Sequence, residues 1–252
     1  MRKRAAAVLA AILTTAVAAC GSSASGDEDL VVSAASSLTQ ALTAYGRSFD
    51  GGAVRFQFAG SDELAAQIRA GVKPDVFASA NTSLPDRLHE AGLVGRPVVF
   101  AGNRLVIAVP AEAAKVSSIA DLAKPGTTIA VGSEEVPIGS YTRAAIGRLG
   151  GTRSAAVLAN VRSNEPDVKG LVGKLTQGAV DAGFLYVTDV TATSGKLRAI
   201  ELPTSLQPSV AYGIAVVAGA KHPAAAQRFV AGLLHGKGAD QLRAAGFDPP
   251  PT

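Results

Sequence analysis

The feature that most constrains the fold is a regular alternation of short apolar runs and amphipathic runs, which starts at Leu30 and continues nearly to the C-terminus. Apolar runs such as LVVSA (30–34) and DVFAS (75–79) are typical of buried strands. A weaker strand is expected over 157–161. Between the strands, apolar residues recur at the spacing of one helix face, as in Leu38, Leu42, Tyr45 and Phe49. The pattern predicts an α/β protein with mixed, mostly parallel sheets covered by helices on both faces.

Two apolar segments look like continuous strands that link two lobes, namely RLVIAVP (104–110) and VAYGIAVV (210–217). We therefore expect one lobe from residues 28–108 plus 214–252, and a second lobe from residues 109–213. In open α/β sheets, ligands bind beyond the carboxyl ends of the strands, where the helices begin. The sequence thus predicts a ligand cleft between the lobes.

The charge of the chain argues against a nucleic-acid partner. The formal net charge is +4, and Arg2, Lys3 and Arg4 supply three of those charges, so the rest of the chain carries about +1. Aromatic residues make up 5% of the sequence, and there is no Trp on which bases could stack. A basic stripe, which nucleic-acid binding requires, is therefore not indicated.

The first twenty residues, MRKRAAAVLAAILTTAVAAC, have a basic start, an apolar run and small residues before a Cys. This pattern is typical of a secretory signal, and it is short for a membrane span. VAAC (17–20) resembles the lipobox of bacterial lipoproteins, so we expect a signal peptide over 1–19 and a lipid on Cys20. The polar stretch 20–29 suits a flexible tether. The alternative is that Cys20 only ends an ordinary signal. An extracytoplasmic, lipid-anchored protein is expected.

Small polar residues and prolines occupy several predicted strand-to-helix junctions. Ser37 and Ser61 follow strands, while Pro137 and Pro166 open later helices. The first N–H groups of a helix have no acceptor within it, and the helix dipole favours negative charge there. Several such ends in one cleft would form an anion site from neutral donors. Each residue alone also has a structural explanation, since Ser37 with Gln40 fits a capping box and Ser61 fits an N-cap.

At this point the chain resembles a known family, the substrate-binding proteins of bacterial molybdate ABC transporters. The resemblance covers about residues 30–247 and rests on segments in the family's order: AASSLTQAL, FAGSDELAAQI, GVKPDVFASAN, NRLVIAVP, VGSEEVPIGSYTRAAI and DAGFLYVTDV. It implies a type II periplasmic-binding fold, with two α/β lobes around a cleft and a two-strand hinge. It also implies a monomeric receptor that passes molybdate or tungstate to a membrane permease served by a separate ATPase subunit.

The resemblance also assigns ligand-binding residues. The two serine ligands of the family fall on Ser37 and Ser61, the backbone donors on Ile138 and Val168, and the tyrosine hydroxyl on Tyr186. No cofactor is implied, and molybdenum would be bound only as molybdate through these same residues. Molybdate is a dianion that only accepts hydrogen bonds, so a shell of donors suits it, and charge-assisted bonds are strong. From the residues alone, Tyr186 could equally be part of an apolar core.

Three residues depart from the family pattern or leave the ligand open. Asp62 stands where a run of serines is common, and a carboxylate facing inward would favour phosphate, which keeps a proton near neutral pH. The alternative is that Asp62 faces solvent in the first helical turn. Ile138 is bulkier than the small residue common there. Lys169 could reach the mouth of the cleft or remain in solvent. A binding protein for sulfate or phosphate is therefore the main alternative.

An enzyme is a weaker alternative. The sequence has no G-x-S-x-G, P-loop or H-E-x-x-H motif. His89, His222 and His235 are scattered, without the spacing of a metal pair on a helix. A lipoprotein that only adheres to other proteins would not need the recurrent polar junctions. We therefore expect a binding protein that is not an enzyme.

Overall fold

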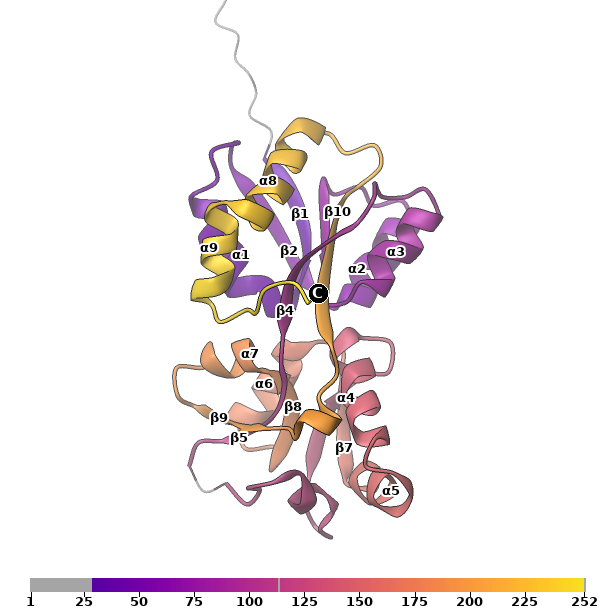
Figure 1. Cartoon of the computed structure of the whole chain (residues 1–252), viewed down its shortest axis with the longest axis vertical. Helices are drawn as coiled ribbons and strands as arrows, with labels where there is room; N and C mark the ends of the chain where they lie inside the picture. Colours follow the sequence, from indigo (N-terminus) through magenta and orange to yellow (C-terminus); the bar gives the residue numbers. More distant parts are fainter. Residues whose placement is uncertain (1–28, 113, 252) are drawn as a thin grey trace, which may run out of the picture.

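The computed structural model describes residues 29–112 and 114–251, which form two sheets with helices around them (Figure 1). The first sheet has the order β2-β1-β3-β10-β4. Its strands are β1 (Leu30–Ala35), β2 (Val54–Ala59), β3 (Val76–Ser79), β4 (Val98–Asn103) and β10 (Val210–Val216). β1 pairs in parallel with β2 and β3, whereas β10 runs antiparallel to both β3 and β4. One strand of this sheet therefore opposes the other four.

The second sheet repeats this plan with the order β7-β6-β8-β5-β9. Its strands are β5 (Leu105–Pro110), β6 (Ile129–Gly132), β7 (Val161–Glu165), β8 (Ala182–Tyr186) and β9 (Leu197–Glu201). Here β6 pairs in parallel with β7 and β8, and β5 runs antiparallel to β8 and β9. The predicted fold class, two lobes built on mixed and mostly parallel sheets, is confirmed.

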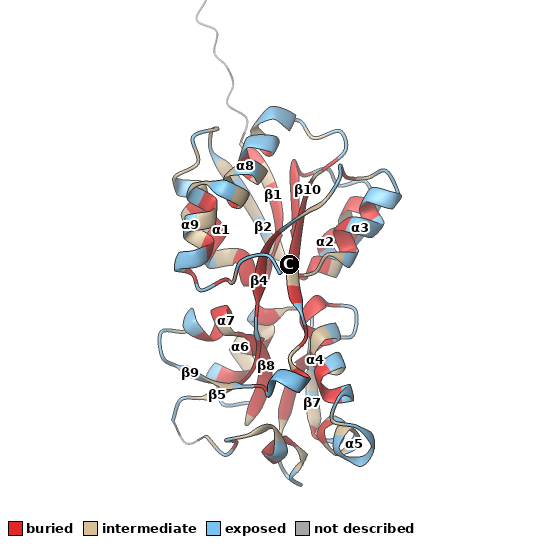
Figure 2. Ribbon diagram, viewed as in Figure 1, coloured by how far each residue is buried: buried red, intermediate tan, exposed pale blue. Residues whose placement is uncertain are grey.

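Helices flank both sheets, and their apolar faces complete the cores. The helices around the first sheet are α1 (Thr39–Arg47), α2 (Ser61–Arg69), α3 (Ser83–Glu90), α8 (Pro223–His235) and α9 (Lys237–Ala244). Those around the second are α4 (Pro137–Gly147), α5 (Gly151–Ala159), α6 (Val168–Thr176) and α7 (Val187–Thr191). Short 3₁₀ turns are η1 (Ser36–Leu38), η2 (Ile119–Ala123) and η3 (Thr204–Leu206). Figure 2 shows that the central strands are buried and that the outer helix faces are exposed.

The segment 157–161, expected as a weak strand, is mostly helix. α5 occupies Gly151–Ala159, and the strand β7 begins only at Val161. The reason is the Gly150–Gly151 pair, which follows α4 and at which α5 begins. Both glycines have positive φ, at 74° and 37°, so the chain turns there and a new helix starts at once. Strands β4 and β9 and helix α9 are further elements that the sequence analysis did not identify.

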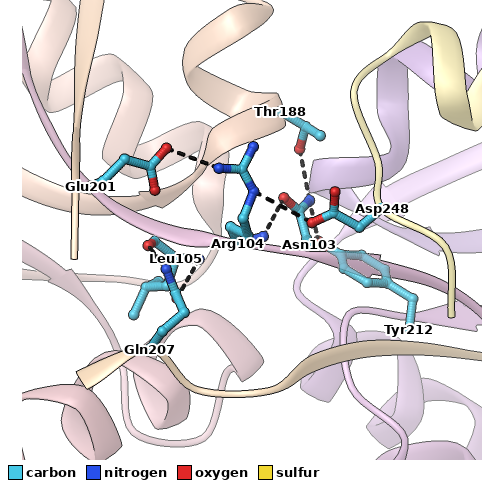
Figure 3. Close-up of polar contacts among 8 residues, drawn as sticks. All are labelled: Asn103, Arg104, Leu105, Thr188, Glu201, Gln207, Tyr212 and Asp248. Carbon is cyan, nitrogen blue, oxygen red and sulfur yellow. Dashed lines mark hydrogen bonds and ion pairs between the residues drawn. The ribbon is translucent and has the colours of Figure 1, made fainter. Parts of the chain in front are cut away.

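Two chain segments cross between the sheets and lie side by side (Figure 1). β4 passes into β5 with only Arg104 between them, and the second crossing runs from β9 through η3 to β10. Gln207 clamps the two crossings together, because its side chain accepts from the Leu105 N–H and donates to the Leu105 carbonyl, both at 3.0 Å. Figure 3 shows this clamp beside Arg104. The predicted two-strand link is therefore present, and the residue ranges given for the lobes stay a prediction.

Candidate functional site

A small cavity lies between the two sheets, at the ends of strands β1, β2, β3 and β8. Its volume is about 20 Å³, which is room for little more than one small molecule or ion. All five residues predicted to bind the ligand line this cavity, namely Ser37, Ser61, Ile138, Val168 and Tyr186, and Ser36 lines it as well. The fold thus brings together five residues that lie up to 149 positions apart in the sequence.

The two serines are not helix caps. The N-cap of α2 is Gly60, without a side-chain capping bond, and Ser61 is the first helical residue. The Oγ of Ser61 instead accepts a hydrogen bond from the Ala80 N–H at 3.1 Å. Ser37 lies in η1, where no side-chain cap is formed, and its Oγ lies 3.0 Å from the Tyr212 hydroxyl. The capping alternatives are therefore wrong, and both buried hydroxyls stand at the cavity wall.

Two helix starts form the opposite wall. Ile138 is the second residue of α4, after Pro137, and Val168 is the first residue of α6. Backbone N–H groups at these positions have no acceptor within their own helices. A Cβ on Gly139 would lie 1.8 Å from the Ser133 carbonyl oxygen, so only glycine allows α4 to start this close to the preceding turn. The bulky Ile138 side chain is buried and does not prevent the helix start from lining the cavity.

Tyr186 ends β8 and is fully buried. Among the described residues, its hydroxyl has no hydrogen-bond partner. Burial raises the pKa of this phenol well above its usual value, so it stays protonated and can donate. A buried hydroxyl without a partner is costly. This hydroxyl lines the cavity, where a bound group that accepts hydrogen bonds would satisfy it.

Charged residues near the cavity do not reach into it as donors. Lys169 is exposed and lies over the Phe58 ring, with Nζ 5.4 Å from the centroid. Asp62 is half-buried and is absent from the described cavity lining, although one of its oxygens is buried without a partner. Asp167 does line the cavity, but it is the N-cap of α6 and accepts from the Gly170 N–H at 2.9 Å. The Asp62 Oδ1 lies 2.8 Å from where a Cβ on Gly60, a residue of the cavity lining, would stand. This oxygen therefore faces the surroundings of the cavity and not solvent, and the phosphate alternative stays for a titration to decide.

A wider groove of about 600 Å³ adjoins the cavity, and the two share Ser36, Ser37 and Val168. Asp189, in the first turn of α7, lines this groove, and its Oδ2 accepts from the Tyr186 N–H at 3.1 Å. Burial, with the nearby Asp167 charge, raises the pKa of Asp189 to about 7, against the lowering effect of that bond. This carboxyl therefore titrates near neutral pH beside the cavity.

The described residues contain no cluster of three or more His, Cys, Asp or Glu side chains suited to a metal ion. Sequence reasoning missed Asn103 and Tyr212, which stand directly behind Ser37. Asn103 ends the apolar strand β4 and Tyr212 lies inside β10, and nothing local in the sequence marks either residue as part of a site. Cys20 lies outside the described residues. Within them, no helix is long and apolar enough to cross a membrane.

The model of one protein family, the bacterial extracellular solute-binding proteins, matches residues 30–248. The chain belongs to this family. It is 37% identical to the molybdate-binding protein ModA of Mycobacterium tuberculosis over 231 residues, and this alignment covers 89% of this chain and 86% of the relative. It is 29% identical over 202 residues to Escherichia coli ModA, covering 75% and 77%.

Solved structures of solute-binding proteins share the fold. The periplasmic molybdate-binding protein of Azotobacter vinelandii superposes with a TM-score of 0.79 at 21% identity, covering 88% of this chain and all of that one. The sulfate-binding protein SubI of M. tuberculosis superposes with a TM-score of 0.78 at 18% identity, covering 88% and 86%. At these identities the likeness supports the two-lobe architecture alone. The predicted family resemblance and fold are therefore confirmed.

Proposed function

We propose that this protein is an extracytoplasmic receptor that binds molybdate, and tungstate as well, and delivers it to the permease of an ABC transporter. The observation that carries the proposal is the small inter-lobe cavity, which gathers two serine hydroxyls, two helix starts and the unpartnered Tyr186 hydroxyl. The relatives named for molybdate binding, which match most of this chain, support the choice of anion.

The chemistry of the cavity suits a tetrahedral dianion. Ser37 and Ser61 donate from the first lobe, while the N–H groups of Ile138 and Val168 and the Tyr186 hydroxyl donate from the second. Among the described residues, the cavity lining contains no Lys or Arg. Neutral donors avoid the cost of removing water from a buried cation, and hydrogen bonds to a charged acceptor are about twice as strong as neutral ones. No cofactor takes part.

Lobe closure is part of the proposed function. The lobe from residues 28–108 plus 214–252 and the lobe from residues 109–213 would move about the crossing segments and enclose the anion. The closed protein, as a monomer, would then meet the permease, which works with a separate ATPase subunit. In this scheme the chain itself performs no chemical reaction and is not an enzyme.

A lipid on Cys20 would hold the receptor at the outer face of the cell membrane, with residues 20–29 as its tether. The basic and apolar start over 1–19 supports this part of the proposal. Metabolic labelling with a radioactive fatty acid tests it. The wild-type chain should incorporate label and sediment with membranes, and Cys20→Ala should do neither. Membrane association of Cys20→Ala equal to that of the wild type would contradict the anchor.

Calorimetric titration with molybdate, tungstate, sulfate and phosphate at neutral pH tests the ligand. One-to-one binding of molybdate and tungstate, with a weak response to sulfate, is expected. Ser37→Ala and Ser61→Ala should each weaken molybdate binding by about 1–3 kcal/mol through a lost hydrogen bond. Preference for sulfate or phosphate would move the protein to another oxyanion class. Unchanged affinity in both variants would refute the assigned site.

A further inference from the structure

The Ser37 hydroxyl forms a hydrogen bond with the Tyr212 hydroxyl, and the two oxygens lie 3.0 Å apart. Both side chains are buried, at 9% and 0% exposure. Distance alone leaves either oxygen as the donor. The choice matters for function, because a hydroxyl that donates to Tyr212 offers the ligand only lone pairs, whereas one that accepts from Tyr212 keeps its proton for the ligand.

Asn103 settles the direction of this bond. Its side-chain nitrogen lies 3.5 Å from the Tyr212 hydroxyl and donates to Thr188 Oγ1 at 2.9 Å (Figure 3). An amide nitrogen can only donate. The orientation of the amide is fixed by its other end, because Asn103 Oδ1 accepts from the Arg104 N–H at 2.9 Å. The Tyr212 oxygen therefore accepts a hydrogen bond from the Asn103 amide.

The Tyr212 proton then has one acceptor among the described residues, the Oγ of Ser37. The reverse arrangement would leave a buried phenol proton unpaired, which is unfavourable. Burial also raises the pKa of Tyr212 well above its usual value, so the phenol keeps that proton. With one of its two lone pairs occupied by the Tyr212 proton, the Ser37 hydroxyl is left with its own proton to offer toward the cavity. Ser61 has the same polarity, because the Ala80 N–H occupies its Oγ.

We propose that Asn103 and Tyr212 are positioning residues that fix the Ser37 hydroxyl as a donor and thereby select fully deprotonated oxyanions over oxyanions that carry a proton. This inference rests on the proposed function and adds the basis of its selectivity. A proton on the anion needs an acceptor in the shell. A hydroxyl that already accepts from a neighbour and directs its own proton at the ligand is a poor acceptor, so a protonated anion leaves one of its own hydrogen bonds unmade.

The relay also joins the two sheets. Ser37 and Tyr212 belong to the first sheet and its connections, Asn103 ends β4 where the chain crosses, and Thr188 lies in α7 of the second lobe. The Asn103 amide therefore contacts β10 of the first sheet and the helix that follows β8 of the second, where Thr188 is two residues beyond Tyr186. The same amide that sets the polarity of Ser37 therefore lies beside the end of β8.

Two substitutions test the relay. Tyr212→Phe keeps the ring and removes the hydroxyl, so Ser37 is free to rotate and accept. Asn103→Asp replaces the donor by an acceptor of the same shape. The new carboxylate would accept a hydrogen bond from the Tyr212 hydroxyl, Tyr212 would accept from Ser37, and Ser37 would present lone pairs to the ligand. Tyr45→Phe is the matched control, since its hydroxyl donates to the Phe229 carbonyl at 3.2 Å within the first lobe.

The readout is the ratio of molybdate affinity to phosphate affinity, measured by calorimetric displacement at slightly alkaline pH. Both anions are then dianions, and only phosphate carries a proton. Because their charges are equal, repulsion by the new carboxylate cancels in the ratio. We expect the ratio to fall at least about fivefold in Tyr212→Phe and at least about tenfold in Asn103→Asp, and to stay unchanged in Tyr45→Phe.

Equal weakening of both anions, with an unchanged ratio in Tyr212→Phe and Asn103→Asp, would make these residues merely structural and overturn the relay while leaving the proposed function intact. A wild-type protein that binds no tetrahedral oxyanion would instead refute the proposed function, and the relay with it. The two failures are thus told apart by the wild-type titration, which is carried out first.

Discussion

Replacing Tyr186 by Phe should separate ligand binding from folding. The hydroxyl is fully buried and has no partner among the described residues, so the protein without ligand gains nothing from it. A hydrogen bond to a charged group contributes about 1.5–3 kcal/mol. Tyr186→Phe should therefore weaken molybdate binding by about 10- to 150-fold. The free energy of unfolding without ligand should stay equal or rise, because an unsatisfied polar group is removed.

The same substitution at Tyr45 should give the opposite pattern. Its hydroxyl donates to the Phe229 carbonyl at 3.2 Å, in the core of the first lobe. Tyr45→Phe loses about 1 kcal/mol of stability, which lowers the unfolding midpoint by about 2–4 °C in a chain of this size. Molybdate affinity should be unchanged.

Calorimetry for binding and thermal unfolding without ligand measure both variants. If Tyr186→Phe lowers the unfolding midpoint as much as Tyr45→Phe does and keeps its affinity, the hydroxyl of Tyr186 supports the fold and not the ligand. That outcome would refute the reasoning from the unpartnered hydroxyl. A loss of affinity without a loss of stability is the expected result.

Further predictions concern stability. Burial raises the pKa of Asp189 in the folded protein to about 7. The contribution of this carboxyl to the free energy of unfolding is therefore fully present below the pKa of an unfolded Asp, and it declines as the pH rises from there to about 7. Asp189→Asn should flatten that decline in pH-dependent denaturation, and an unchanged profile would contradict it. Gly139→Ala should lower the free energy of unfolding by several kcal/mol, because the new Cβ would lie 1.8 Å from a backbone oxygen. Gly147→Ala, where a Cβ meets open space, should leave that free energy unchanged or raise it, and urea unfolding measures both variants. The Asp75 carboxylate accepts hydrogen bonds from the Val31 N–H at 2.9 Å and from the His222 N–H at 2.8 Å. Asp75→Ala should therefore lower the free energy of unfolding by about 1–3 kcal/mol. A smaller loss would mean that water replaces the carboxylate.

Local patterns were enough to predict the α/β class and the two crossing segments. Apolar runs such as 104–110 and 210–217 are long and uninterrupted, so their period and length identify them as strands. The segment 157–161 was misassigned because its alternating pattern is weak. There the Gly150–Gly151 turn, with its positive φ values, determines where α5 begins.

The cavity could be anticipated only in part. The resemblance pointed to residues that line it, but the groups behind them come from distant positions. Tyr212 reaches Ser37 across 175 residues, and Asn103 reaches Tyr212 across 109. Neither has a local signature, because a Tyr in an apolar strand also suits a core. The raised pKa of Asp189 depends on burial that only the folded chain produces.

The position of β10 has a consequence for the order in which the chain can fold. In the first sheet, β10 lies between β3 and β4 (Figure 1). Among the described residues, β10 is the one strand that pairs with β4, and Asp248, still later in the sequence, adds an isolated bridge to Gly102. The strands β5 to β9 of the second sheet all precede β10 in the sequence. During synthesis, every strand of the second sheet therefore leaves the ribosome before β4 can find its partner. Contacts between such distant positions form slowly. The second sheet can assemble first, and until Val216 is made the apolar strands β3 and β4 keep unpaired edges that favour aggregation.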